Sequence, residues 1–92
     1  MDAEVRFGQL MDGASKLLMA GKLEEARPLA EEALRFNDQQ MDADGPGAAW
    51  VLVVLGEIRW RTGDLKGAKL LLGRALPIHE KLMGLFHKMT IQ

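Results

Sequence analysis

The chain has 92 residues, of which 48% are apolar and 27% charged, with no cysteine and a formal net charge of −1. The lack of cysteine excludes a disulfide framework and a thiolate zinc site. The apolar content argues against a disordered chain. The near-zero net charge removes an overall electrostatic basis for nucleic-acid binding. The longest strongly apolar run, Ala48 to Leu55, is too short for a membrane span of about 20 residues and the N-terminus does not resemble a signal peptide, so we expect one cytoplasmic domain over residues 1–92.

The first half of the chain predicts a pair of helices. From Ala3 onward, apolar residues recur at steps of three and four, which places them on one face of a helix. Gly21 is expected to end this helix, because glycine adopts the left-handed conformation of a helix C-cap at low cost. A second helix starts near Leu23 with one apolar and one charged face, and the glycine- and aspartate-rich stretch 42–47 breaks it. We therefore assign residues from about 3 to 44 to a first unit.

The second half of the chain predicts a similar pair. A third helix starts near Ala48 and ends before a turn at Gly63–Asp64, where the aspartate can cap the next helix. The last helix starts at Leu65 and continues past Pro77. No stretch keeps the two-residue alternation of a strand for long enough. The sequence therefore predicts an all-α fold of four helices in two tandem helix-turn-helix units, the second spanning about residues 47–89.

The two halves match when the chain is laid on itself with an offset of 42 residues. The matched positions are small or apolar, as expected where two units share a packing scheme rather than a surface. They pair Leu10 with Leu52, Gly21 with Gly63, Leu23 with Leu65, Ala26 with Ala68, Leu29 with Leu71, Ala33 with Ala75, Leu34 with Leu76 and Met41 with Met83. Such a repeat is typical of stacked helical arrays.

These residues resemble the tetratricopeptide repeat, a family of helix-turn-helix units. The first-helix pattern of the family is matched by Leu52-x2-Leu55-Gly56-x2-Arg59, and the second-helix pattern by Ala26-x3-Ala30-x2-Ala33 and Ala68-x3-Leu72-x2-Ala75. The 42-residue period is longer than the usual period of about 34 and is similar to that of the kinesin-light-chain subtype. Residues 26–29 and 74–78, and the pair Gly84-x2-His87, also resemble that subtype.

The resemblance implies a partner-binding surface. Members of the family generally bind a peptide or helix along the concave surface formed by the first helix of each unit. The corresponding positions here are Met11, Asp12, Ser15, Leu18, Met19, Trp50, Val53, Val54, Glu57, Trp60 and Arg61. The Lys, Arg and Asn residues that hold a C-terminal carboxylate in one subclass are missing, so carboxylate capture is not predicted. An apolar stripe of this kind is also what an ordinary helical core looks like.

The apolar surface of the chain exceeds what four helices readily cover. The run Ala48 to Leu55 is apolar all the way round, and no polar helix follows the last one. The last helix contributes the apolar residues Leu70, Leu72, Ile78, Leu82, Leu85 and Phe86. Since stacked arrays usually need capped ends and about three repeats, we expect a protein or peptide partner to cover these faces. A homodimer is the leading expectation.

Charge is divided between the two halves. Residues 1–46 contain ten acidic and five basic residues, a charge of −5, whereas residues 47–92 contain three acidic and seven basic residues, a charge of +4. One interpretation is that the acidic half of one copy meets the basic half of another. The alternative is an uneven distribution of ordinary solvated helix faces.

Catalytic and metal chemistry is not indicated. No convergent acid, base and nucleophile are visible, so the sequence predicts no enzyme and no cofactor. His79 and His87 lie eight residues apart, which is long for a chelate from one helix, so no metal site is predicted beside Glu80.

Two alternative functions stay open. One is a small chaperone that shields an apolar client segment, and the other is a regulatory fragment that contacts nucleic acid through Arg59, Arg61, Lys66, Lys69 and Arg74.

Overall fold

A computed structural model describes the backbone of residues 2–91 and the side chains of residues 2–84. Its four helices are α1 (Ala3–Met19), α2 (Leu23–Gln40), α3 (Pro46–Arg61) and α4 (Leu65–Ile91), and residues 2–91 include no strand. The expected all-α fold with four helices is confirmed. The expected roles of the side chains of Leu85, Phe86 and His87 lie outside the described side chains.

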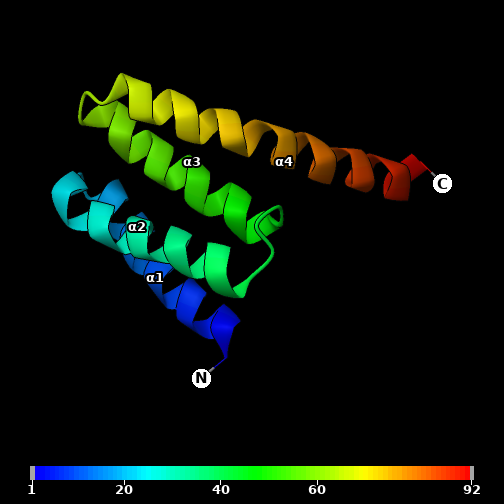
Figure 1. Cartoon of the computed structure of the whole chain (residues 1–92), viewed down its shortest axis with the longest axis horizontal. Helices are drawn as coiled ribbons and strands as arrows, with labels where there is room; N and C mark the ends of the chain where they lie inside the picture. The colour runs from blue at the N-terminus through cyan, green and yellow to red at the C-terminus, as the bar shows by residue number, and fades with distance from the viewer. Residues whose placement is uncertain (1, 92) are drawn as a thin grey trace.

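The helices form two hairpins that stack side by side (Figure 1). Helices α1 and α2 form the first hairpin, α3 and α4 form the second, and consecutive helices run in opposite directions. Helix α3 packs on α2, with a smaller contact on α1, while α4 packs on α3 at one edge of the stack. Because α4 is 27 residues long and α3 only 16, the C-terminal part of α4 projects beyond the body of the molecule.

The turn inside each hairpin has the same geometry. Gly21 and Gly63 have positive φ angles of 78° and 89°, the only such glycines in the described part of the chain. At the first turn, the N–H of Lys22 donates to the carbonyl oxygen of Leu17 at 2.8 Å. At the second turn, the N–H of Asp64 donates to the carbonyl oxygen of Arg59, also at 2.8 Å. Both turns are therefore Schellman C-caps, a geometry that glycine adopts without steric cost.

Small residues on α2 set the spacing of the stack. Ala26, Ala30 and Ala33 are completely buried, and the absence of larger side chains lets α1 and α3 approach α2 closely. The main core lies between these three helices. Its other buried members are Phe7, Leu10, Met11, Ala14, Leu18, Val51, Val54, Leu55 and Ile58. A second, smaller cluster joins α3 to α4 through Ala48, Leu52, Ala75 and Ile78.

The side chains of Asp64 and Asn37 hydrogen-bond to the backbone of the segments that join one helix to the next. The carboxylate of Asp64 accepts a hydrogen bond from the N–H of Gly67 at 2.9 Å, which caps the first turn of α4 as expected. The buried side chain of Asn37 donates from Nδ2 to the carbonyl oxygen of Asp42 at 3.4 Å. This bond connects the end of α2 to the loop that leads into α3.

Candidate functional site

Helix α3 carries an exposed apolar stripe because its surface is apolar on nearly every side. Helices α2 and α4, with a smaller contribution from α1, cover Val51, Leu52, Val54, Leu55 and Ile58, together with the small Ala48 and Gly56. The remaining side faces solvent. There, Trp50 is 45% exposed, Val53 51% and Trp60 61%. The neighbouring helices leave this side of α3 uncovered, so its apolar side chains are accessible from solvent.

Trp50 is held in place by an aromatic contact with α1. Its ring meets that of Phe7 edge to face, with ring centroids 6.1 Å apart and an interplanar angle of 75°. This geometry is favourable for two aromatic quadrupoles. Since Phe7 is buried, the contact fixes one side of the Trp50 ring and leaves the other exposed.

Charged residues border this apolar stripe. Arg61 pairs with Glu57 on the next turn of α3 at 3.3 Å, and Lys16 pairs with Asp12 on α1 at 3.0 Å. All four side chains are well exposed, so each pair contributes little to stability. Glu57 and Arg61 are exposed on the same helix as Trp50 and Val53, and such a mixture of apolar and charged side chains is typical of protein interfaces.

The sequence-predicted site residues fall into two groups. Asp12, Met19, Trp50, Val53, Glu57, Trp60 and Arg61 are exposed and Ser15 is half-buried. In contrast, Met11 is completely buried, Leu18 is 7% exposed and Val54 is 8% exposed. These three are core residues between the first hairpin and α3, and their assignment to the partner-binding surface was wrong.

The correction has a simple geometric cause. Residues three and four apart share a helix face, so Met11 and Val54 lie next to exposed positions in the pattern. The close approach of α3 to the first hairpin then covers them. Ile78, expected to lack cover on the last helix, is also buried, because it packs on Ala48 and Leu52 of α3. Leu70 and Leu72 are exposed as expected.

A groove between α3 and α4 contains residues that the sequence alone did not single out. We call it the α3–α4 groove. It has a volume of about 490 Å³ and is lined by Trp60, Leu65, Ala68, Lys69, Leu72, Gly73 and Leu76. Gly56 lies under its floor, where an added Cβ would come within 2.9 Å of Leu72. Leu65 and Leu76 could have been found from their matches to Leu23 and Leu34, but those matches indicated only shared packing.

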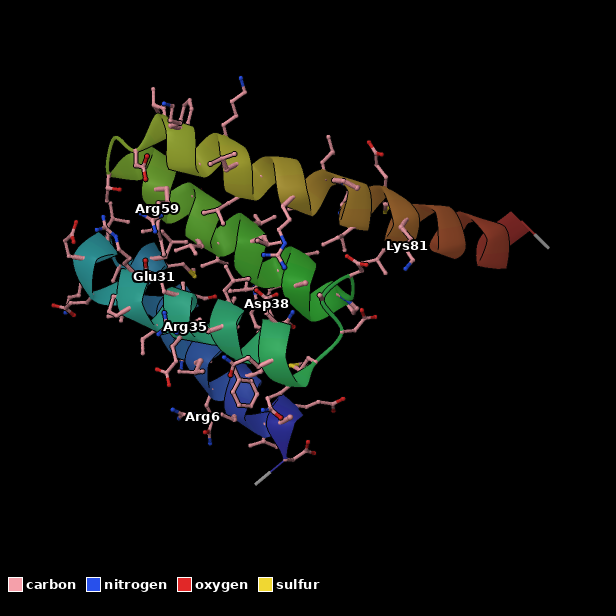
Figure 2. The ribbon with its side chains drawn as sticks, in the orientation of Figure 1. Arg6, Glu31, Arg35, Asp38, Arg59 and Lys81 are labelled. Carbon is pink, nitrogen blue, oxygen red and sulfur yellow. The ribbon has the colours of Figure 1, made fainter. Side chains whose placement is uncertain are left out.

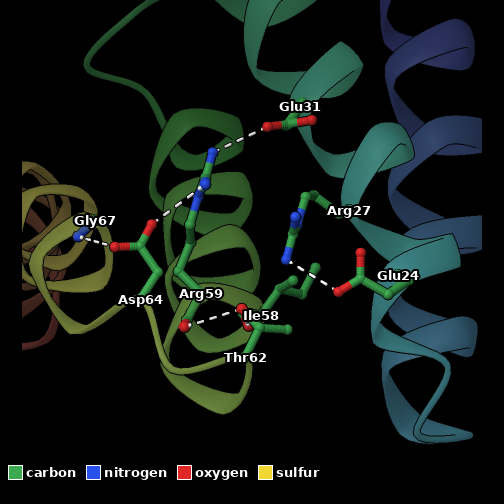
Figure 3. A network of polar contacts seen from close by, with 8 residues as sticks. All are labelled: Glu24, Arg27, Glu31, Ile58, Arg59, Thr62, Asp64 and Gly67. Atoms are coloured by element: carbon green, nitrogen blue, oxygen red, sulfur yellow. Dashed lines mark hydrogen bonds and ion pairs between the residues drawn. The ribbon is translucent and has the colours of Figure 1, made fainter.

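Ion pairs join the two hairpins within one chain. The guanidinium of Arg59 on α3 donates to Glu31 on α2 at 2.9 Å and to Asp64 at 3.3 Å (Figure 3). Arg74 on α4 donates to Asp38 on α2 at 2.7 Å. Glu31, Arg59 and Asp38 follow the boundary between the hairpins (Figure 2). The charge division between the two halves is therefore used inside the chain, which the sequence interpretation did not foresee.

The described residues also bear on two other kinds of site, a metal centre and a membrane span. Within this part of the chain, no group of three His, Cys, Asp or Glu side chains is placed to hold a metal ion. Nor does any helix there combine the length and the apolar character needed to cross a bilayer.

A family comparison agrees with this architecture. Residues 14–81, about three quarters of the chain, match the model of the tetratricopeptide repeat family. The matched range runs from the middle of α1 to the projecting part of α4. No curated protein and no solved structure gives a significant match. With two helix-turn-helix hairpins, alanine-lined contacts and a family match over most of its length, the chain belongs to the tetratricopeptide repeat family.

Proposed function

We propose that this chain is a protein-interaction module that binds a helix or peptide of another protein chain, a second copy included, through the exposed surface of α3 and α4. The family generally mediates protein–protein interaction. The observation that supports the proposal most directly is Trp60, which is 61% exposed at the edge of the apolar α3–α4 groove. An exposed tryptophan beside a largely apolar groove is typical of a binding anchor, because it buries a large area with little loss of side-chain entropy.

The geometry favours a helical partner over an extended one. The described part of the chain offers no strand edge to which an extended peptide could add. Instead, the exposed side chains of α3 and α4 form ridges along two neighbouring helices. A helix can lay its own apolar face between such ridges, as α3 does against the first hairpin.

The basic surface gives less support to the nucleic-acid alternative. Arg59 and Arg74 pair with carboxylates of the first hairpin, and Arg61 pairs with Glu57 on its own helix. A phosphate would have to displace these carboxylates to reach the three arginines, which leaves Lys66 and Lys69 as the exposed basic residues of that set. We also propose that the repeat is of the kinesin-light-chain-like subtype, which the 42-residue period supports. A cytoplasmic location is likewise part of this proposal.

A display library of amphipathic helices tests the proposal without knowledge of the natural partner. Sequences selected on the wild-type protein should bind it in solution and lose at least about tenfold in affinity when Trp60→Glu places a charge at the groove. Leu70→Glu is the matched control, because Leu70 is 72% exposed on α4 but does not line the groove. Far-UV circular dichroism checks that both variants keep their helices.

Two results would contradict the proposal. One is that no helix is enriched while the wild-type protein stays monomeric. The other is that Trp60→Glu and Leu70→Glu reduce binding equally, which would mean that binding does not depend on the α3–α4 groove.

A further inference from the structure

We infer that the α3–α4 groove receives helix α4 of a second copy, and that the two α4 helices pair antiparallel about a two-fold axis. This inference rests on the proposed function and identifies its partner. The contact is made by a row of residues that we call the α4 seam. The seam consists of Leu65, Lys69, Leu72, Leu76, His79 and Met83.

The first hairpin contains a matching row of residues, and there the row is covered by another helix. The 42-residue offset matches the α4 seam to a row of residues that we call the α2 row: Leu23, Arg27, Ala30, Leu34 and Asn37 of α2, and Met41, which directly follows the helix. None of the six residues of the α2 row is exposed, whereas all six residues of the α4 seam are exposed. The α2 row is covered because α3 lies antiparallel along it. The corresponding row on α4 is the place where an antiparallel helix is missing.

The spacing of the α4 seam fits pairing between two long helices. Its residues are separated by four, three, four, three and four positions, the seven-residue repeat that produces knobs-into-holes packing. Leu65, Leu72, Leu76 and Met83 are each between 40% and 57% exposed. The seam also reaches the part of α4 that projects past α3, where no other described helix of the same chain lies beside it (Figure 1).

Charge selects the antiparallel direction. Lys66 and Glu80 border the α4 seam on the same side, are both exposed, and form no ion pair with a described side chain of their own chain. In a parallel pair in register, residues on the same side of the seam lie on opposite sides of the two-fold axis, so Lys66 and Glu80 could not meet and this ion pair would be lost. In an antiparallel pair, Lys66 faces Glu80 of the second copy, and the same contact recurs at the symmetry-related position.

The same register gives a consistent seam. Leu72 then lies opposite Leu76 of the second copy, and Leu65 lies opposite Met83, beside the exposed ring of Trp60. Gly73 comes next to its own symmetry mate, where an added Cβ would meet nothing within 4 Å in the single chain. This open position allows the two helix backbones to approach closely. Lys69 lies opposite His79, and the two-fold axis repeats this contact, so that the pair has two polar layers, a feature that fixes register at some cost in affinity.

The other end of the molecule is a poorer partner for the groove. The outer side of α1 presents Arg6, Gln9, Asp12 and Lys16, all exposed. A head-to-tail stack would bury these charged side chains against Leu72 and Leu76, which is unfavourable. A two-fold contact between identical apolar faces avoids this cost and closes the assembly at a dimer.

Charge reversal tests the register by sedimentation equilibrium. The wild-type chain should be a dimer at tens of micromolar. Lys66→Glu and Glu80→Lys should each weaken the dimer, raising its Kd by roughly tenfold, because each places like charges opposite one another. The double variant should restore the wild-type Kd. Lys81→Glu, on the side of α4 that carries no seam residue, is the matched control and should leave the Kd unchanged.

Cysteine crosslinking tests the direction independently, since the chain has no native cysteine. Gly73→Cys should form a disulfide-linked dimer on mild oxidation. Lys66→Cys and Glu80→Cys should crosslink to each other when mixed, but neither should crosslink to itself. Lys81→Cys should stay monomeric on a denaturing gel.

The outcomes separate this inference from the function on which it rests. A wild-type monomer at tens of micromolar, or self-crosslinking of Lys66→Cys, overturns the antiparallel pairing. If helices from the display library still bind the wild-type groove in that case, the interaction function survives and only the partner is different. If both experiments fail, the proposed function fails as well.

Discussion

The α2 row and the α4 seam occupy the same place in the two hairpins, yet one is covered and the other is open. Ala30 is completely buried, whereas its counterpart Leu72 is 40% exposed; Leu18 is 7% exposed and its counterpart Trp60 is 61% exposed. The difference arises because α3 packs on the first hairpin and covers the α2 row, whereas among the described residues α4 contacts only α3 and no helix covers its seam. Two hairpins of similar sequence pattern thus acquire different roles, one as core and one as surface.

The strongest test of this contrast uses two adjacent valines on α3. Val54 faces the covered side and is 8% exposed, whereas Val53 faces outward and is 51% exposed. Val54→Glu should lower the free energy of unfolding by about 3 kcal/mol or more, because it buries a carboxylate without a partner. Val53→Glu should change it by less than about 0.5 kcal/mol. Urea denaturation followed by circular dichroism measures both values, and equal losses would show that the two faces are not distinct.

A second test exchanges side-chain size between the two rows. Ala30→Leu should reduce stability by about 1 to 3 kcal/mol, because the added atoms have no space between α2 and α3. Leu72→Ala should cost the single chain less, about 1 kcal/mol or below, since Leu72 is 40% exposed and its truncation leaves no enclosed cavity. Thermal unfolding at low protein concentration makes this comparison without a contribution from assembly. A stable Ala30→Leu variant would mean that α3 is not packed closely on α2.

The third and smallest test concerns the turns, where the hairpins are alike. Gly21→Ala and Gly63→Ala should each cost about 1 kcal/mol, because alanine is strained at the positive φ angles of both positions. An added Cβ meets nothing within 4 Å at either glycine, so the conformational cost is the whole effect. Chemical denaturation of both variants should therefore give the same loss. A clear difference between them would show that the matching turn geometry does not carry equal strain.

Much of the fold could be predicted because its determinants are local. Apolar residues at helical spacing gave four helices, and Gly21 and Gly63 gave the two turns. The cap at Asp64 followed from residue type and position alone. These features depend on a few neighbouring residues and not on how distant segments pack.

The candidate site was predicted only in part. An amphipathic helix shows which of its sides is buried, but α3 is apolar all round from Ala48 to Leu55. Its periodicity therefore did not distinguish Val53 from Val54, and the burial of Met11 by α3 could not be read from α1. Likewise, the ion pair of Arg59 with Glu31 joins residues 28 positions apart, and nothing in their local sequence indicates it.

The sequence by itself determined that the chain is helical, that its two halves repeat with an offset of 42 residues, and that it has more apolar side chains than four helices readily cover. Only the tertiary structure decided which of the apolar side chains are buried and which are left exposed. The physical reason is that helix formation depends on near neighbours along the chain, whereas burial depends on which helices lie side by side. Helix α3 covers the first hairpin, and the same stripe on α4 is left exposed to another molecule.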